Sequence, residues 1–123
     1  MSLNSITANT KSGIFLYNGP SALLTATLSR NTIKNNTEHG INAKSLGGDL
    51  TVDAGGGSQS SVGLNTISGQ DNGVHNNVYV SGEAAAVTAK YNWWSNATLT
   101  SGAAAQDYYA VSSGTITATN PNS

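Results

Sequence analysis

An asparagine recurs four times in this chain with nearly the same neighbours, and this repeat constrains the fold more than any other feature. The four units read N-S-I, N-T-I, N-T-I and N-W-W, and they begin at Asn4, Asn31, Asn65 and Asn92. Successive asparagines are 27, 34 and 27 residues apart. Self-similarity at periods of about 20–50 residues is typical of solenoids, in which each repeat forms one coil and stacked coils bury a shared core. The 123 residues are expected to form one solenoid domain, with repeats at about 3–30, 31–64, 65–91 and 92–119.

A glycine and a β-branched aliphatic residue follow each of the first three asparagines at a nearly constant distance. These pairs are Gly13-Ile14, Gly40-Ile41 and Gly73-Val74. Short runs rich in Val, Ile, Leu and Thr, bounded by Gly, Asn and Ser, predict strands with one buried face. The expected strands cover 13–17, 40–44 and 73–80 after the glycines, 23–28, 50–53, 86–91 and 114–119 in the Thr-bearing runs, and 31–33, 65–67 and 92–94 at the asparagine units. The best helix candidate, the Ala-rich stretch 103–110, is too short to be stable alone.

The repeated residues are expected to build the corners of the coils and not a reactive site. Asparagine tolerates left-handed backbone angles, which suits a sharp corner, and stacked asparagines can form a ladder of amide hydrogen bonds. The repeated glycines would permit a positive φ or a close approach of two backbones. The residues two positions after each asparagine are expected to point inward as an apolar row, and they are Ile6, Ile33, Ile67 and Trp94.

The chain resembles the right-handed parallel β-helix repeat proteins of bacteria, a superfamily of pectate lyase-like enzymes and bacterial surface proteins. The resemblance lies in the N-x-I-x6-G-I units and in the Y-N-W-W-S sequence, residues 91–95, that closes them. Many of those proteins end their helix near an NWWG sequence, whose glycine is replaced here by Ser95. The resemblance covers residues 3–95 and implies an all-β fold, a short right-handed parallel β-helix of about four coils. A shallow antiparallel sandwich is the alternative fold. Carbohydrate enzymes, adhesins, autotransported surface proteins and phage tailspikes share the family fold, so the fold does not select a function.

The composition excludes several classes of partner and site. Only 9% of the residues are charged, against about 25% in an average soluble protein, and a net charge of −1 gives no basic surface for nucleic acid or an anionic membrane. There is no cysteine, hence no disulfide and no thiolate metal ligand. No apolar run of about 18 residues predicts a transmembrane helix, and the N-terminal sequence has no signal-peptide pattern. We therefore expect no metal, no cofactor, no nucleic-acid partner and no membrane insertion.

The chain offers few groups for catalysis. Aligned by repeat, Lys11, Glu38 and Asp71 would form a column on adjacent coils, with the two carboxylates that glycoside hydrolysis requires. A solvated turn edge is the simpler interpretation of this column. Lyases of this fold use a basic proton abstractor beside carboxylate-bound calcium, and none of the five Lys and Arg residues lies beside two acids at equivalent positions. His39 and His75 are offset in the repeat, so they do not supply the converging ligands of a zinc site.

The places where the repeat breaks are better candidates for function. The Gly- and Ser-rich stretch 54–61 accounts for the seven extra residues of the middle repeat and predicts a flexible loop, either a tolerated insertion or a binding loop. Trp93 is expected to face outward, because adjacent residues of a strand point to opposite sides. The aromatic candidates for ligand binding are Trp93, Tyr79, Tyr108 and Tyr109. Alternatively, the C-terminal segment 95–123 covers Trp93 and the open end of the column as a cap.

These features favour a non-catalytic cell-surface or secreted module that binds carbohydrate or protein. The alternative is a fragment of a carbohydrate-active enzyme, either a polysaccharide lyase or a glycoside hydrolase. Both ends of a short solenoid expose strand edges, which favours homo-oligomers formed through the ends. For the full-length protein we expect an extracellular or cell-surface location.

Overall fold

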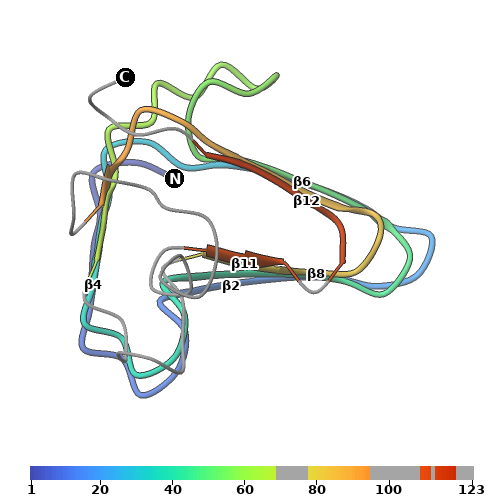
Figure 1. Cartoon of the computed structure of the whole chain (residues 1–123), viewed down its shortest axis with the longest axis horizontal. Helices are drawn as coiled ribbons and strands as arrows, with labels where there is room; N and C mark the ends of the chain where they lie inside the picture. The colour runs from blue at the N-terminus through green and yellow to red at the C-terminus, as the bar shows by residue number, and fades with distance from the viewer. Residues whose placement is uncertain (69–77, 95–108, 112, 119–123) are drawn as a thin grey trace.

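The computed structural model describes residues 1–68, 78–94, 109–111 and 113–118, and within these residues the chain is all-β with no helix (Figure 1). The strands are β1 Ser5–Thr7, β2 Ile14–Asn18, β3 Leu23–Thr27, β4 Thr32–Lys34, β5 Ile41–Ser45, β6 Asp49–Asp53, β7 Thr66–Ser68, β8 Val78–Ser81, β9 Ala85–Ala89, β10 Trp93–Trp94, β11 Tyr109–Val111 and β12 Thr115–Ala118. The strand regions that the sequence predicts at the asparagine units, after the first two glycines and in the Thr-bearing runs are confirmed.

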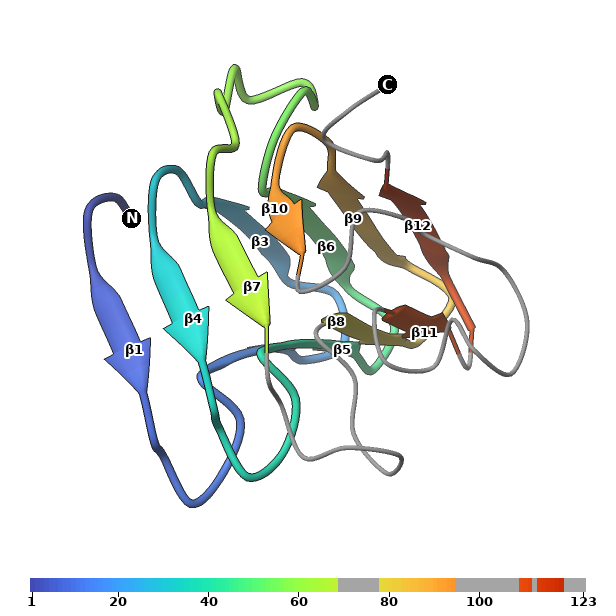
Figure 2. The ribbon, with the colours of Figure 1, turned by 60° about the vertical axis from the view of Figure 1, so that its left-hand side comes forward.

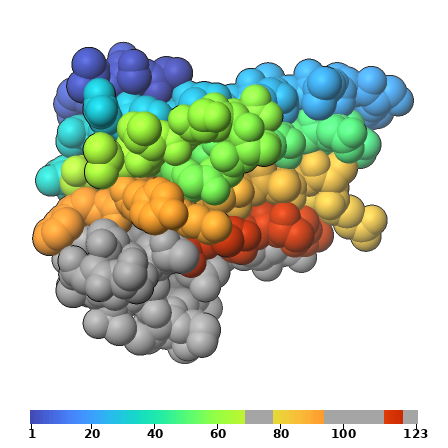
Figure 3. All heavy atoms as spheres, turned by 90° about the horizontal axis from the view of Figure 1, so that it is seen from above, coloured from blue at the N-terminus to red at the C-terminus, as the bar shows by residue number. Residues whose placement is uncertain are grey.

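The strands form three parallel sheets, and each sheet takes one strand from every repeat. We name them the ladder sheet (β1-β4-β7-β10), the aromatic sheet (β11-β8-β5-β2) and the threonine sheet (β12-β9-β6-β3). The strands of the ladder sheet lie side by side in Figure 2, and Figure 3 shows the repeats stacked as layers. All strand pairs in the described part of the chain are parallel, so the alternative of an antiparallel sandwich is wrong. The topology is compatible with a parallel β-solenoid.

The register of the aromatic sheet corrects one part of the repeat alignment. Ile14 pairs with Ile41, and Ile41 pairs with Val78. The predicted match of Gly73-Val74 to the earlier glycine pairs is therefore wrong, because Val78 and not Val74 is the register partner of Ile41. Burial selects this register, because Val80 pairs with the buried Ala43, whereas a register that paired Val74 with Ile41 would put Asn76 at this apolar position.

Strand β11 lies where the sequence offers its best helix candidate. Tyr109–Val111 overlaps the end of the Ala-rich stretch 103–110 and pairs in parallel with β8. Pairing with an existing sheet edge overrides the weak local helix propensity of these residues.

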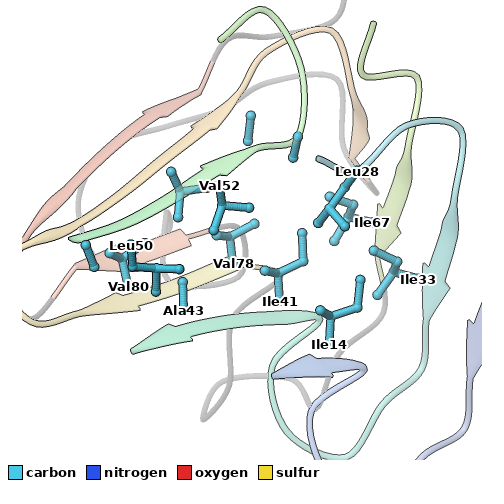
Figure 4. Packing of buried hydrophobic residues seen from close by; sticks show 14 residues of the cluster. Ile14, Leu28, Ile33, Ile41, Ala43, Leu50, Val52, Ile67, Val78 and Val80 are labelled. Carbon is cyan, nitrogen blue, oxygen red and sulfur yellow. The ribbon is translucent and has the colours of Figure 1, made fainter. Parts of the chain in front are cut away.

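The inward-facing side chains stack into one apolar column (Figure 4). Every second residue of the central strands is buried, as the sequence alternation predicts. The buried apolar residues are Ile14, Leu28, Ile33, Ile41, Ala43, Leu50, Val52, Ala54, Ile67, Val78, Val80, Ala85, Val87 and Ala89. Each large member stabilises the fold by about 1.5–3 kcal/mol. Because this core is aliphatic, any chemistry of the described residues belongs to the outer faces and the corners.

The corner between the threonine sheet and the ladder sheet, which we call the ladder corner, turns on a left-handed residue in each repeat. This residue directly precedes the repeated asparagine. The four residues are Leu3, Arg30, Leu64 and Tyr91, with φ of 57°, 56°, 58° and 58°. The prediction that the asparagines themselves take the left-handed angle is wrong, since their side chains hold the corner while the preceding residue makes the bend.

We expect substitutions of Arg30 to show how much free energy this left-handed angle costs. A left-handed angle costs an L-residue roughly 1–2 kcal/mol, whereas glycine avoids that cost but loses about 0.4–1 kcal/mol through the entropy of the unfolded chain. Arg30→Gly should therefore leave the free energy of unfolding within about 1 kcal/mol of the wild-type value, and β-branched Arg30→Val should lower it by about 1–2 kcal/mol. Urea denaturation checks both variants, and equal midpoints for glycine and valine would contradict the assignment.

Candidate functional site

The repeated asparagines form a continuous ladder of hydrogen bonds along the ladder corner. Asn4 Nδ2 donates to Asn31 Oδ1 at 3.0 Å, Asn31 Nδ2 to Asn65 Oδ1 at 2.9 Å, and Asn65 Nδ2 to Asn92 Oδ1 at 2.8 Å. Each accepting oxygen also receives the backbone N–H of the preceding asparagine. The predicted amide ladder is confirmed, and Asn31, Asn65 and Asn92 are buried. Because these buried amides are used within the fold, they are structural groups and not ligand-binding groups.

A second, shorter ladder joins the turns between the ladder sheet and the aromatic sheet, and the sequence reasoning missed it. Asn9 Nδ2 donates to Asn36 Oδ1 at 2.8 Å. A Cβ at Gly13 would lie 2.7 Å from Asn36 Nδ2 and 2.9 Å from the carbonyl oxygen of Gly40. Gly13 is thus needed for a close approach and not for a positive φ, while Gly73 lies outside the described residues. The spacing of 27 residues between Asn9 and Asn36 was the signal that could have revealed this ladder.

The insertion in the middle repeat folds around the carboxylate of Asp53. The Asp53 Oδ1 atom accepts the backbone N–H groups of Gly55 and Gly57, both at 3.0 Å, and Oδ2 accepts those of Gln59 at 2.9 Å and Ser61 at 3.1 Å. Burial opposes ionisation of this carboxyl, but the four hydrogen bonds outweigh burial and hold its pKa below the ordinary value. The loop that the sequence predicts as flexible therefore has four backbone N–H groups fixed on one buried charge.

This insertion, drawn in green at the top of Figure 2, lies beside the N-W-W unit of the next repeat. The backbone N–H of Ala54 donates to the carbonyl of Thr88 at 2.7 Å, and that of Lys90 donates to the carbonyl of Gly55 at 3.0 Å. A Cβ at Gly56 would lie 2.8 Å from the ring of Tyr91. The insertion 54–61 and the N-W-W unit, which are far apart in the sequence, thus lie next to each other at the ladder corner.

An open groove of about 520 Å³ follows this corner. It is lined by Val62, Leu64, Tyr91, Asn92 and Trp93. Tyr91 and Trp93 are 54% and 58% exposed, so the predicted outward position of Trp93 is confirmed. Asn92 accepts the Nδ2 hydrogen of Asn65 at 2.8 Å and donates to the carbonyl of Ala54 at 2.9 Å. The groove therefore offers aromatic and aliphatic surface, while the amide in its lining is already hydrogen-bonded.

The outer face of the aromatic sheet carries a second cluster of aromatic side chains. Phe15, Asn42 and Tyr79 are register partners on the adjacent strands β2, β5 and β8. The ring of Tyr17 lies 6.1 Å from that of Phe15, at an interplanar angle of 44°. The imidazole of His39 stacks on Tyr79 with centroids 4.6 Å apart and an angle of 9°. We call this set of side chains the aromatic face.

A smaller groove of about 230 Å³ opens beside Phe15, and its lining also includes Lys11, Ser12, Glu38 and Asn42. The carboxylate of Glu38 accepts Lys11 Nζ at 2.9 Å and Ser12 Oγ at 3.3 Å. The hydrogen bond and the charge of Glu38 raise the pKa of Lys11 above its ordinary value, so Lys11 is protonated at neutral pH. Asn42 Oδ1 is buried and accepts no hydrogen bond. One aromatic ring therefore meets a carboxylate, an ammonium group, a hydroxyl group and an amide.

The structure separates the residues that the sequence predicts for ligand binding. Trp93 belongs to the ladder sheet and Tyr79 to the aromatic sheet. Tyr109 lies in β11, where its backbone pairs with Val78, and Tyr108 lies outside the described residues. Trp93 and Tyr79 therefore do not form a single site.

Sequence reasoning missed Phe15 and Asn42, since neither marks a break in the repeat. Their signal was the equal position of an aromatic and an amide residue in the strands I-F-L-Y-N and I-N-A-K-S, each flanked by aliphatic residues. The predicted column of Lys11 and Glu38 is present as an ion pair, and its third member, Asp71, lies outside the described residues.

In the parts of the chain that the structure describes, no three His, Asp or Glu side chains are grouped to hold a metal ion. The same parts contain no helix that could cross a bilayer. None of the family models, curated proteins and solved structures compared with this chain matches it.

Proposed function

We propose that this chain is a non-catalytic carbohydrate-binding module built on a right-handed parallel β-helix of about four coils. The observation that supports it best is the groove beside Phe15, in which an aromatic ring adjoins Asn42, Glu38 and Ser12. A surface or secreted location accords with such a module and is part of the proposal.

The chemistry of this groove matches what a sugar ring presents. The C–H face of a pyranose packs on an aromatic ring, while its hydroxyl groups need directional hydrogen-bond partners. Phe15 is 57% exposed and supplies the ring. The Asn42 Oδ1 atom lacks a donor, so a small shift of its side chain would let a sugar hydroxyl satisfy it. Glu38 adds a carboxylate, a strong acceptor for hydroxyl groups, to the same lining.

The aromatic face extends this groove along the solenoid axis. Phe15 and Tyr79 lie on either side of Asn42, so their backbones are about 9–10 Å apart, twice the spacing between neighbouring strands. A ligand that lies across the strands would meet Phe15, Asn42 and Tyr79 in turn. This geometry favours an oligosaccharide over a single sugar.

A carbohydrate-active enzyme is the competing proposal, and the described residues give it less support. Glycoside hydrolysis requires two carboxylates. Glu38 is the one carboxylate that lines the groove among the residues that the structure describes, and it is paired with Lys11. Turnover of polyuronides, measured with and without calcium, would favour the enzyme and refute our proposal.

We expect Phe15→Ala to weaken glycan binding at least tenfold, which corresponds to roughly 1.4 kcal/mol. Asn42→Ala should also weaken binding without lowering the stability of the free protein, because it removes a buried acceptor that has no partner. A glycan array identifies the ligand, and isothermal titration calorimetry measures the affinity of each variant.

Trp93→Ala is the matched control, since it removes an aromatic side chain of similar exposure from the other groove. Glycan binding that survives both Phe15→Ala and Asn42→Ala but disappears in Trp93→Ala would move the site to the ladder corner. Absence of any binding on the array would refute the proposed function.

Self-association through the solenoid ends is a further part of the proposal. At the end formed by β1, β2 and β3, Ile6, Leu16 and Leu24 pack on the core but are only partly buried. Within the described residues each of these strands is the edge strand of its sheet, so its outer edge can pair with a second copy.

A further inference from the structure

The ladder corner concentrates exposed apolar side chains on one edge of the molecule. Five large apolar residues there are between 48% and 77% exposed, and we call them the corner patch: Leu3, Val62, Leu64, Tyr91 and Trp93. Three of them occupy the left-handed position that precedes a ladder asparagine. Because this position recurs in every repeat, the bend that builds the solenoid also points a row of side chains into solvent. Exposed apolar surface that is contiguous, as it is along the groove lined by Val62, Leu64, Tyr91 and Trp93, marks an interaction site.

Two basic residues of the described chain lie beside the corner patch. Arg30 is exposed and fills the left-handed position between Leu3 and Leu64. Lys90 directly precedes Tyr91, and its side-chain stem runs along the insertion, with Cδ 3.1 Å from a Cβ built at Gly56.

In the part of the chain that the structure describes, no exposed carboxylate lies beside these cations. Of the described carboxylates, Glu38 lies ahead of β5, Asp49 begins β6, and Glu83 lies between β8 and β9, away from the ladder corner. Asp53 is at the corner but buried, with its carboxylate surrounded by four N–H donors. The net charge of −1 is therefore compatible with a basic edge, which consists of the exposed Arg30 and the half-buried Lys90.

The side chains of the corner patch suit a lipid surface better than a sugar or a protein segment bound in the groove. A sugar needs free hydrogen-bond partners, and the amide of Asn92 in the groove is already used. The patch is an exposed row and not a deep pocket, so each side chain can insert without a partner of complementary shape. Tyrosine and tryptophan prefer the membrane–water interface, and arginine and lysine are attracted to anionic headgroups.

In contrast to the expectation from the net charge, we propose that the ladder corner docks peripherally on an anionic lipid surface, with Leu64, Tyr91 and Trp93 at the interface and with Arg30 and Lys90 on the headgroups. The aromatic face lies on a different sheet, so it stays accessible to a glycan in this orientation. The proposal does not depend on glycan binding.

The experiment uses vesicles of phosphatidylcholine with and without phosphatidylserine, and co-sedimentation of the whole chain. We expect binding to the anionic vesicles that weakens with added salt, and much weaker binding to phosphatidylcholine alone. Trp93→Ser and Leu64→Ser should each reduce binding about tenfold, and Arg30→Gln about fivefold. Phe15→Ser is the matched control, because Phe15 is 57% exposed against 58% for Trp93 but lies on the aromatic face. Its binding to vesicles should be unchanged.

Three results would overturn the proposal. One is no binding to the anionic vesicles at low salt by a protein whose circular dichroism shows it folded. Another is an equal loss of binding in Phe15→Ser and Trp93→Ser, which would mean non-specific adhesion. The third is binding that depends on Arg30 but survives both serine variants, which would indicate charge alone and hence an acidic polymer or protein as the partner. Failure of the glycan array leaves each of these results interpretable, since the two sites share no residue.

Discussion

Replacing Asn65 by alanine is expected to lower the free energy of unfolding by about 2–6 kcal/mol, because the two Asn31 N–H groups that lose their acceptor cost roughly 1–3 kcal/mol each. Asn65 is fully buried, and its Nδ2 donates to Asn92 Oδ1 and to the carbonyls of Leu28 and Ala54. Its Oδ1 accepts the backbone and side-chain N–H groups of Asn31. Small domains have a total stability of only about 5–15 kcal/mol, so this change should move the urea midpoint far toward zero.

Asn4→Ala is the control for this prediction, because it deletes a ladder residue of the same type at the exposed end. Asn4 Nδ2 donates to Asn31 Oδ1 and to the carbonyl of Ser2, and the first bond is partly buried while the second is exposed. We expect a loss of about 0.5–1.5 kcal/mol. If Asn65→Ala cost no more than Asn4→Ala in the same denaturation experiment, the ladder would not be the structural element that we infer.

Replacing Asp53 by asparagine is expected to lower the free energy of unfolding by about 2–6 kcal/mol and to change how stability depends on pH. Asparagine keeps the size of the side chain but turns one acceptor into a donor, so two of the four N–H groups lose their partner at roughly 1–3 kcal/mol each. Urea denaturation at neutral pH measures the loss. Asp49→Asn is the matched control in the same strand, and its exposed side chain should change stability by less than about 0.5 kcal/mol.

The pH dependence follows from the lowered pKa of Asp53. A carboxyl with a pKa below its ordinary value of 3.8 stabilises the folded state fully above that pH, and the stabilisation is lost as the pH falls through the folded-state pKa. The wild-type protein should lose stability when the pH falls below about 4, and the Asp53→Asn profile should be flatter over the same range. Parallel profiles for the two proteins would show that the carboxylate is not the charge that holds the insertion.

The sequence predicts the sheets better than the site, for a physical reason. Inward residues such as Ile33 and Ile67 repeat because stacked coils bury them against each other, so their spacing is visible in the sequence. The position of Val78 in the repeat could not be predicted from the spacing. The Gly73-Val74 pair, four residues earlier, has the same pattern as the earlier glycine pairs, but the register follows the buried residues of β8. Asp53 could not be predicted as the centre of its loop, since the four N–H groups converge on it only after the chain folds. Trp93 was identified because it replaces a threonine in a repeated position, whereas Phe15 was missed because it breaks no pattern.

The carboxylate of Asp53 also explains how coils of unequal length share one register. The middle repeat is seven residues longer than its neighbours, yet the strands before and after the insertion pair with both adjacent coils. The extra residues leave the stacked strands and rejoin them without changing the strand register. This is possible because backbone N–H groups of the insertion bind the carboxylate of Asp53, which is itself a residue of β6. In the coils on either side the same position holds Thr27 and Thr88. A single acidic substitution at an outward position therefore gives a solenoid a place where new surface can be added without disturbing the stack.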